Sequence, residues 1–139
     1  MELEIREAVS SDIRDIKRLL SFYFLDTESV EKNLHGFIVA VLNWETVGCA
    51  GLYANIELGA IAVLPVHRNK GIGSKLVDSV LERAACPGGI LYLRTTVPSF
   101  FEKKGFTRLQ NAEKKNIWKD CMTCDKFDNC RQTPMNINL

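Results

Sequence analysis

The hydrophobic positions change their period along the N-terminal part of the chain, and each period predicts an element. Residues 3–9 alternate apolar and polar side chains, as a half-buried strand does. Residues 11–24 place apolar side chains at helical spacing, behind a Ser10–Asp12 segment suited to an N-cap and a negative first turn. The polar residues 25–35 predict a short second helix or a loop.

Three β-rich runs follow this segment. Residues 37–43 and 46–54 are separated at residues 43–45, where Asn-Trp-Glu predicts the turn of a hairpin. The run ELGAIAVL at residues 57–64 carries small and branched side chains without alternation. We therefore expect a third strand there, buried on both faces.

The next part of the chain returns to helical periodicity. An apolar stripe predicts a helix that the Cys-Pro-Gly-Gly segment at residues 86–89 ends. Residues 89–95 then predict a strand, residues 98–105 a short helix, and residues 106–109 the start of a last strand. The stripe consists of Leu76, Val77, Val80, Leu81, Ala84 and Ala85.

The order of these elements, βα(α)βββαβαβ, predicts the α/β (α+β) fold class, with a mixed central sheet flanked by helices. A chain of 139 residues fits one domain, which we place at residues 1–139. Its final part, about residues 111–139, loses periodicity and is expected to form an extension that contains three of the five cysteines.

The charge balance limits the classes of partner. Eighteen basic against 17 acidic residues give a net charge of +1, which provides no general field for nucleic acid or an anionic membrane. We therefore expect neither as a partner. The N-terminus is charged from its second residue and does not resemble a secretory signal, and the apolar stretches fall short of a bilayer span. Five cysteines without an export signal suggest reduced thiols and a cytoplasmic location.

The segment LPVHRNKGIGSK at residues 64–75 is suited to bind an anion. It lies between a predicted strand and a predicted helix, where the first helical N–H groups lack partners and the helix dipole is positive. A diphosphate is the natural ligand of such a site. Gly71 and Gly73 allow close approach to the backbone, and Arg68 and Lys70 can add charge-assisted hydrogen bonds.

Two other nucleotide motifs fit this segment poorly. A Walker A loop requires Gly-Lys-Ser/Thr, but the order here is Gly73-Ser74-Lys75. A dinucleotide fingerprint requires a third glycine, where this chain has Leu76. The remaining alternative is a solvated basic helix start without a ligand.

The sequence RNKGIG at residues 68–73, preceded by AVLP, closely resembles the pyrophosphate loop of the GNAT superfamily of acetyl-CoA-dependent N-acetyltransferases. FFEKKGF at residues 100–106 resembles a further segment of that family, and the element order matches over nearly all of residues 1–110. The resemblance implies acetyl-CoA as the acetyl donor, with a defined set of cofactor-binding residues. These are Ile61, Ala62, Val63, Arg68, Asn69, Lys70, Gly71, Ile72, Gly73 and Ser74.

The same resemblance implies direct attack of an amine on the thioester in a ternary complex. Glu57 matches a strand position at which many relatives carry a catalytic base, although a strand-edge carboxylate without that role is an equal alternative. The oxyanion donor is expected to be a backbone N–H near Val63. Phe101 occupies the position of a tyrosine that acts as general acid in many relatives, so the donor of the proton to the leaving thiolate stays open. Tyr92 is expected in the core.

The acceptor is indicated by a weaker resemblance. LYLRTTVPSFFEKKGF, VGCAGL and ELGAIAVLP are most similar to the acetyltransferase domain of amino-acid N-acetyltransferases such as N-acetylglutamate synthases. This implies a small-molecule amine as partner, with the α-amino group of an amino acid such as glutamate as acceptor. Arg94, Lys103 and Arg108 are candidate cations for its carboxylate. A protein or peptide amine, and a non-catalytic acetyl-CoA-binding module, are the alternatives, and a homodimer is left open.

The extension carries Cys121-x-x-Cys124 followed by Cys130, the start of a zinc knuckle. A closed zinc site needs a fourth ligand that this segment lacks, so we expect no metal. The alternative to a metal site is a packed, reduced loop over the sheet, anchored by Trp118 and Phe127.

The remaining candidate side chains are assigned no chemistry. His35 and His67 have no partners for a catalytic triad. Cys49 and Cys86 lie in apolar patterns and are expected to be buried, unreactive thiols.

Overall fold

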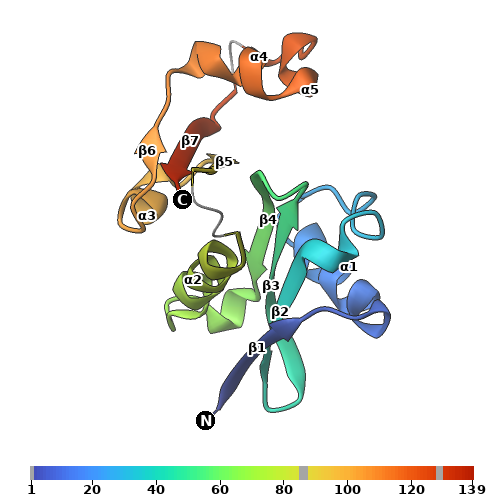
Figure 1. Ribbon diagram of the computed structural model, residues 1–139. Coiled ribbons are helices and arrows are strands. Elements are labelled where there is room, and N and C mark those ends of the chain that lie inside the picture. The colour runs from blue at the N-terminus through green and yellow to red at the C-terminus, as the bar shows by residue number, and fades with distance from the viewer. Residues whose placement is uncertain (1, 85–87, 128–129) are drawn as a thin grey trace.

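The computed structural model describes residues 2–84, 88–127 and 130–139 (Figure 1). Its helices are α1 (Ile13–Ser21), α2 (Ile72–Ala84), α3 (Pro98–Glu102), α4 (Lys114–Ile117) and α5 (Lys119–Met122). Its strands are β1 (Leu3–Glu7), β2 (Phe37–Leu42), β3 (Glu45–Tyr53), β4 (Glu57–Val63), β5 (Ile90–Thr95), β6 (Thr107–Arg108) and β7 (Thr133–Asn138).

The strands form one seven-stranded sheet in the order β1-β2-β3-β4-β5-β7-β6. All neighbours are antiparallel except β4 and β5, which are parallel and share a single register pair, Glu57 with Tyr92. The sheet therefore has two halves that are joined at one point and part beyond it. This mixed sheet with flanking helices confirms the predicted fold class.

Helices α1 and α2 lie on either side of strands β2–β4 in Figure 1. Each buries the apolar stripe that the sequence predicts: Ile16, Leu19 and Leu20 on α1, and Leu76, Val77 and Val80 on α2. A Cβ atom at Gly48 of β3 would lie only 3.1 Å from Leu76 Cδ1. The lack of a side chain there lets α2 pack closely on the sheet.

The N-terminal helix is shorter than its sequence pattern predicts, and its cap differs. A 3-10 turn occupies Ser10–Asp12, and α1 has no side-chain cap. Instead, the Asp12 carboxylate accepts a hydrogen bond from the Val9 N–H (2.8 Å) and two from the Arg6 guanidinium (2.8 and 3.0 Å). The carboxylate therefore fastens the start of the helix to β1.

The predicted hairpin is present, with Asn43 and Trp44 at its turn and Glu45 already in β3. Both turn residues have a positive φ, +50° and +70°, as the tight turns that join antiparallel strands require. Residues 25–27 are irregular, residues 28–33 form turns, and Leu34–Gly36 form a 3-10 helix. Of the two structures predicted for the polar residues 25–35, the loop is thus the one that mainly occurs.

The prediction that residues 57–64 are buried on both faces is wrong. Leu58, Ala60 and Ala62 are buried, whereas Glu57 and the alternate positions up to Val63 are partly or fully exposed. These exposed positions line the cleft between the two halves of the sheet. An unbroken apolar run here reflects a strand that faces an open site.

The C-terminal segment also differs from the expectation. The structure has a strand, β7, between β5 and β6, and the predicted last strand is reduced to the two residues of β6. β7 has the sequence TPMNIN, whose proline and asparagines disfavour strands. The sequence pattern therefore did not predict a strand there. Its six register pairs with β5 define its place.

Two further expectations concern the end of α2 and membranes. Helix α2 is described as far as Ala84, so the predicted stop at residues 86–87 lies outside the described residues, while Gly88 has a φ of +85°. In the part of the chain that the structure describes, every helix is too short or too polar to cross a bilayer.

Candidate active site

A cleft of about 850 Å³ opens where β4 and β5 part. Residues 57–63 of β4 line one wall and residues 93–97 the other. The start of α2 lies at one end, beyond Val63, and the single pair of Glu57 with Tyr92 closes the other end. Six residues of strand separate these ends, about 20 Å. An extended ligand can therefore reach from the helix to Glu57.

The loop before α2 has the backbone of an anion site. Asn69 and Gly71 both have a positive φ, +64° and +80°, so successive N–H groups turn toward the same side. The first backbone bond of the helix joins the Lys75 N–H to the Gly71 carbonyl (3.1 Å), which leaves the N–H groups of residues 72–74 without intrahelical partners. A Cβ atom at Gly71 would meet nothing within 4 Å, since it points into open space.

The backbone of β4 offers further hydrogen-bonding groups. The Leu64 N–H donates to the Val47 carbonyl (2.8 Å), so alternate residues of β4 bond toward β3. Ile61 and Val63 turn their N–H and carbonyl groups the other way, toward the cleft. The Val63 carbonyl already accepts a hydrogen bond from the Tyr23 hydroxyl (2.5 Å). A ligand that pairs with the backbone of Ile61 would depend little on the side chain at that position.

Nine of the ten predicted cofactor-binding residues line this cleft, and Lys70 does not. Lys70 is exposed, and its Nζ lies 3.5 Å from His67 Nδ1. Arg68 lines the cleft and lies over the ring of Tyr23, 5.1 Å from its centroid. Of the two predicted cations of the loop, Arg68 therefore lies at the cleft and Lys70 does not.

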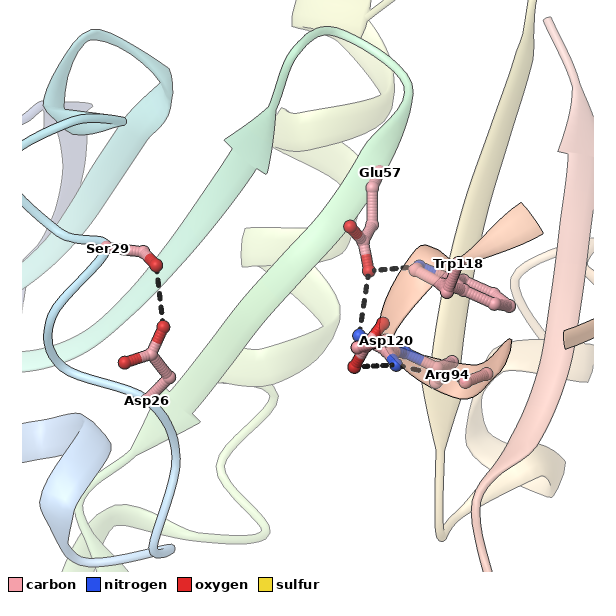
Figure 2. Close-up of polar contacts among 7 residues, drawn as sticks. Asp26, Ser29, Glu57, Arg94, Trp118 and Asp120 are labelled. Atoms are coloured by element: carbon pink, nitrogen blue, oxygen red, sulfur yellow. Dashed lines mark hydrogen bonds and ion pairs between the residues drawn. The ribbon is translucent and has the colours of Figure 1, made fainter. Parts of the chain in front are cut away.

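Glu57 lies at the point where β4 and β5 meet, and it is surrounded by polar groups from distant segments. Figure 2 shows its carboxylate turned toward Trp118 and Arg94. Its Oε2 atom accepts a hydrogen bond from the Trp118 indole N–H (2.8 Å) and lies 3.7 Å from Arg94 Nη2. The Glu57 side chain is 21% exposed and lines the cleft, so it remains accessible to a ligand.

Of the three candidate cations, only Arg94 lines the cleft. Its Nη1 donates to Asp120 (3.0 Å) and to the Cys121 sulfur (3.5 Å), and its guanidinium lies 4.7 Å from the centre of the Trp118 ring. Arg108 pairs with Glu102 on the surface, through two bonds of 3.0 Å. Lys103 is exposed. The choice among the three could not be made from sequence.

Two of the aromatic residues at the cleft, Phe101 and Tyr23, bear on which proton donors are present. Phe101 is buried and lines the cleft, packed edge-on against Phe100 and Phe106, so no hydroxyl stands at its position. Tyr23 brings a hydroxyl to the cleft from the loop after α1. Sequence reasoning missed Tyr23, because the pattern of residues 11–24 places it on a helix, whereas α1 ends at Ser21.

Tyr92 is half-buried, whereas the sequence predicts it in the core. It packs edge-on against Trp118, with the ring centres 6.5 Å apart. On the other side of β4 in Figure 2, Ser29 donates a hydrogen bond to Asp26 (2.6 Å), which ties together the loop whose residues 23–25 line the cleft.

The cysteines of the extension do not converge on one point. Among the described residues, no group of three or more His, Cys, Asp or Glu side chains is placed to hold a metal ion. Cys121 is buried, Cys124 exposed and Cys130 half-buried. Trp118 is buried as expected of an anchor, and Phe127 is half-buried beside Lys115, whose Nζ lies 4.3 Å from the ring centre.

The thiols of Cys49 and Cys130 differ in their surroundings. Burial raises the pKa of the Cys49 thiol to about 12, as expected for an unreactive core cysteine. Burial also acts on Cys130, but the Gln132 N–H and the Lys114 ammonium outweigh it and lower its pKa. Lys114 is fully buried, and its Nζ has no hydrogen-bond partner among the described residues. Cys86 lies outside the described residues.

A mixed sheet that parts between two parallel strands, with a helix N-terminus at the mouth of the gap, defines a class of acyl-group transferases. The GNAT acetyltransferase domain matches residues 33–108, more than half of the 139-residue chain, so the chain belongs to the GNAT family of acetyltransferases. It is an acetyl-CoA-dependent N-acetyltransferase, since acetyl-CoA is the donor that this domain uses.

Relatives with known sequences fit this assignment. An uncharacterized N-acetyltransferase of Chlorobaculum tepidum is 26% identical over 145 residues, which cover 94% of this chain and 93% of that protein. An amino-acid acetyltransferase of Aeromonas salmonicida is 31% identical over 90 residues, which cover 60% of this chain but 20% of the longer protein.

Solved structures share the fold. The Rv2747 protein of Mycobacterium tuberculosis, in complex with CoA, has a TM-score of 0.79 at 22% identity and covers 98% of this chain and 99% of its own. N-acetylglutamate synthase of Neisseria gonorrhoeae, complexed with CoA and N-acetyl-glutamate, has a TM-score of 0.74 at 22% identity, over 100% of this chain and 35% of its own.

Proposed function

We propose that the chain acetylates the α-amino group of an amino acid that carries a second carboxylate, such as glutamate. The observation that carries this proposal is the pairing of one carboxylate, Glu57, with one cation, Arg94, 3.7 Å apart where the cleft ends. The carboxylate can take a proton from an amine, and the cation can hold an acidic group of the same molecule. The named relatives with amino-acid substrates support the same substrate class.

The donor would extend along β4. Its diphosphate would bind the bare N–H groups of residues 72–74, helped by Gly71 and Arg68, and its pantetheine amides would pair with Ile61 and Val63 like an added strand. In this position the thioester points toward Glu57. Since Val63 lies at the diphosphate end of the cleft, a cleft-facing N–H of β4 closer to Glu57 would stabilise the negative charge that develops on the thioester oxygen.

The reaction would proceed by direct attack. The acceptor nitrogen forms a bond to the thioester carbon, the carbon–sulfur bond breaks, and CoA leaves as a thiolate. Glu57 takes the proton that the amine loses, directly or through a water molecule, since an α-amino group with a pKa near ~8 is mostly protonated at neutral pH. A thiol with a pKa near ~8.5 leaves without a strong acid, which suits a cleft with Phe101 where relatives carry tyrosine.

Arg94 is the cation best placed for the acceptor. Its Nη1 is engaged with Asp120, but among the described residues Nε and Nη2 make no hydrogen bond. These two donors form one edge of the guanidinium and match the two oxygens of a carboxylate. Since its side chain is 23% exposed at the cleft, a substrate carboxylate can reach that edge.

The test is release of free thiol from acetyl-CoA with a panel of acceptors: glutamate, glutamine, aspartate, alanine and a short peptide. Turnover highest with glutamate, and a KM for glutamate at least tenfold higher in Arg94→Gln with an unchanged KM for acetyl-CoA, supports the proposal. Glu57→Gln should lower kcat by about 10²–10⁴-fold. Turnover with peptides alone would move the function to protein acetylation, and binding of acetyl-CoA without any turnover would leave a binding module.

A further inference from the structure

The extension places a tryptophan on the proposed catalytic carboxylate. Trp118 lies between α4 and α5, 61 residues after Glu57 in the chain, and donates its indole N–H to Glu57 Oε2 at 2.8 Å. Figure 2 shows the indole turned toward the Glu57 carboxylate. Trp118 itself does not line the cleft, so it contacts Glu57 from the side away from the cleft.

We propose that Trp118 is a positioning residue for Glu57, so that the segment of residues 111–139 completes the active site. This inference rests on the proposed function, since it takes Glu57 as the base. The indole fixes Oε2 on the buried side of the carboxylate. The other oxygen, Oε1, has no hydrogen-bond partner among the described residues and is left for the amine or its water.

Trp118 is itself held in one orientation. It is only 7% exposed, its ring packs edge-on against Tyr92, and the Arg94 guanidinium lies over the same ring. Its backbone is tied on both sides, because its N–H donates to the Lys114 carbonyl (2.8 Å) and its carbonyl accepts from Cys121 (3.2 Å). A donor fixed in this way can restrict the rotamers of Glu57, and a catalytic group held in its productive geometry needs no reorganisation during the reaction.

The N–H group alone can be removed by Trp118→Phe, which keeps an aromatic ring for Tyr92 and Arg94. We expect kcat to fall at least tenfold, while the KM for acetyl-CoA stays within twofold and the melting temperature stays close to that of the parent. In a Glu57→Gln background the same substitution should cost no further activity, because its effect acts through the carboxylate.

The chain provides a matched control, since its second tryptophan, Trp44, is fully exposed at the β2–β3 turn. Trp44→Phe should leave kcat unchanged. In that background Trp118 is the single tryptophan, so its fluorescence emission should shift when Glu57 is changed to Gln. If Trp118→Phe destabilises the protein, Trp118 is replaced by benzothienylalanine, which removes only the N–H and should give the same loss of kcat.

The outcomes separate the two proposals. Full activity in Trp118→Phe, with activity lost in Glu57→Gln, overturns the positioning role and leaves the proposed function in place. Full activity in Glu57→Gln overturns the proposed base and with it the role of Trp118. Equal losses for Trp118→Phe in the parent and in the Glu57→Gln background also overturn the inference, because they show an effect that bypasses the carboxylate.

Discussion

At the scale of single residues, Gly71 and Gly88 share one backbone conformation but face different surroundings. Their φ angles are +80° and +85°, and a Cβ atom at either would meet nothing within 4 Å. Only Gly71 lines the cleft. A side chain at either position therefore adds the same backbone strain, about 1–2 kcal/mol, and differs only in what it does to a ligand.

Gly71→Val is therefore expected to weaken CoA binding at least a hundredfold, because the side chain fills the space that the proposed diphosphate occupies. Gly88→Val, which carries the same strain, should bind CoA as the parent does. Calorimetric titration with CoA measures both. Unchanged affinity in Gly71→Val would remove the loop from the proposed donor site.

The thiols allow a second prediction at this scale. A thiolate reacts with alkylating reagents and a thiol does not, so the lowered pKa of Cys130 and the raised pKa of Cys49 give opposite reactivities at neutral pH. Iodoacetamide at pH 7 should modify Cys130 well before Cys49, as peptide mass spectrometry can record. Lys114→Met should slow modification of Cys130. Equal rates at both cysteines would contradict the assigned environment.

At the scale of elements, the Asp12 carboxylate joins β1 to the start of α1. Its side chain is 7% exposed and accepts hydrogen bonds from both Arg6 nitrogens and from Val9. The hydrogen bond with Arg6 lowers the pKa of Asp12, against the effect of burial. A carboxylate whose pKa is lowered on folding stabilises the fold above its unfolded pKa, near ~3.9, and loses this effect as the pH falls through its folded pKa.

Asp12→Asn should therefore lower the free energy of unfolding by about 1–3 kcal/mol at pH 7. The difference from the parent should shrink progressively below pH 4, where Asp12 of the parent takes up a proton. Urea unfolding at several pH values measures this. Glu31→Gln, which breaks the exposed pair with Lys17, is the control and should have little effect on the free energy of unfolding. An Asp12→Asn effect that persists unchanged at pH 2 would refute the electrostatic explanation.

The elements also show why some of the fold could be predicted and some could not. Helix α2 follows from its stripe, and the turn at residues 43–44 follows from its asparagine, because both depend on neighbours in sequence. β7 has no such signal, since its place is set by backbone bonds to β5. The sequence predicts the cleft-lining positions of β4 as buried, because a cleft wall and a core strand use the same apolar residues.

The site divides in the same way. The anion loop is formed by residues that are close together in sequence, so the spacing of its glycines and cations predicts it before the fold is known. Glu57 could be proposed from its position at the start of a strand. Its contact with Trp118 could not, because the two residues are 61 positions apart and only the tertiary fold brings them together.

At the scale of the whole molecule, the extension is part of the sheet and of the core. Met135 of β7 is fully buried, whereas Met122 of α5 is 63% exposed. Met135→Ala should lower the free energy of unfolding by about 2–5 kcal/mol, since it leaves a cavity between β5 and β6. Met122→Ala, the same change on the surface, should have little effect. Thermal unfolding of both variants tests this, and equal melting temperatures would show that β7 contributes little to the core.

The position of β7 between β5 and β6 also orders events during synthesis. β6 pairs with β7 within the sheet, and β7 is translated after both strands that it joins. Until residues 133–138 leave the ribosome, the wall of the cleft that β5 forms has an open edge. A nascent chain can thus fold its first four strands early, but it completes the sheet around its catalytic centre only after residues 133–138 have been translated.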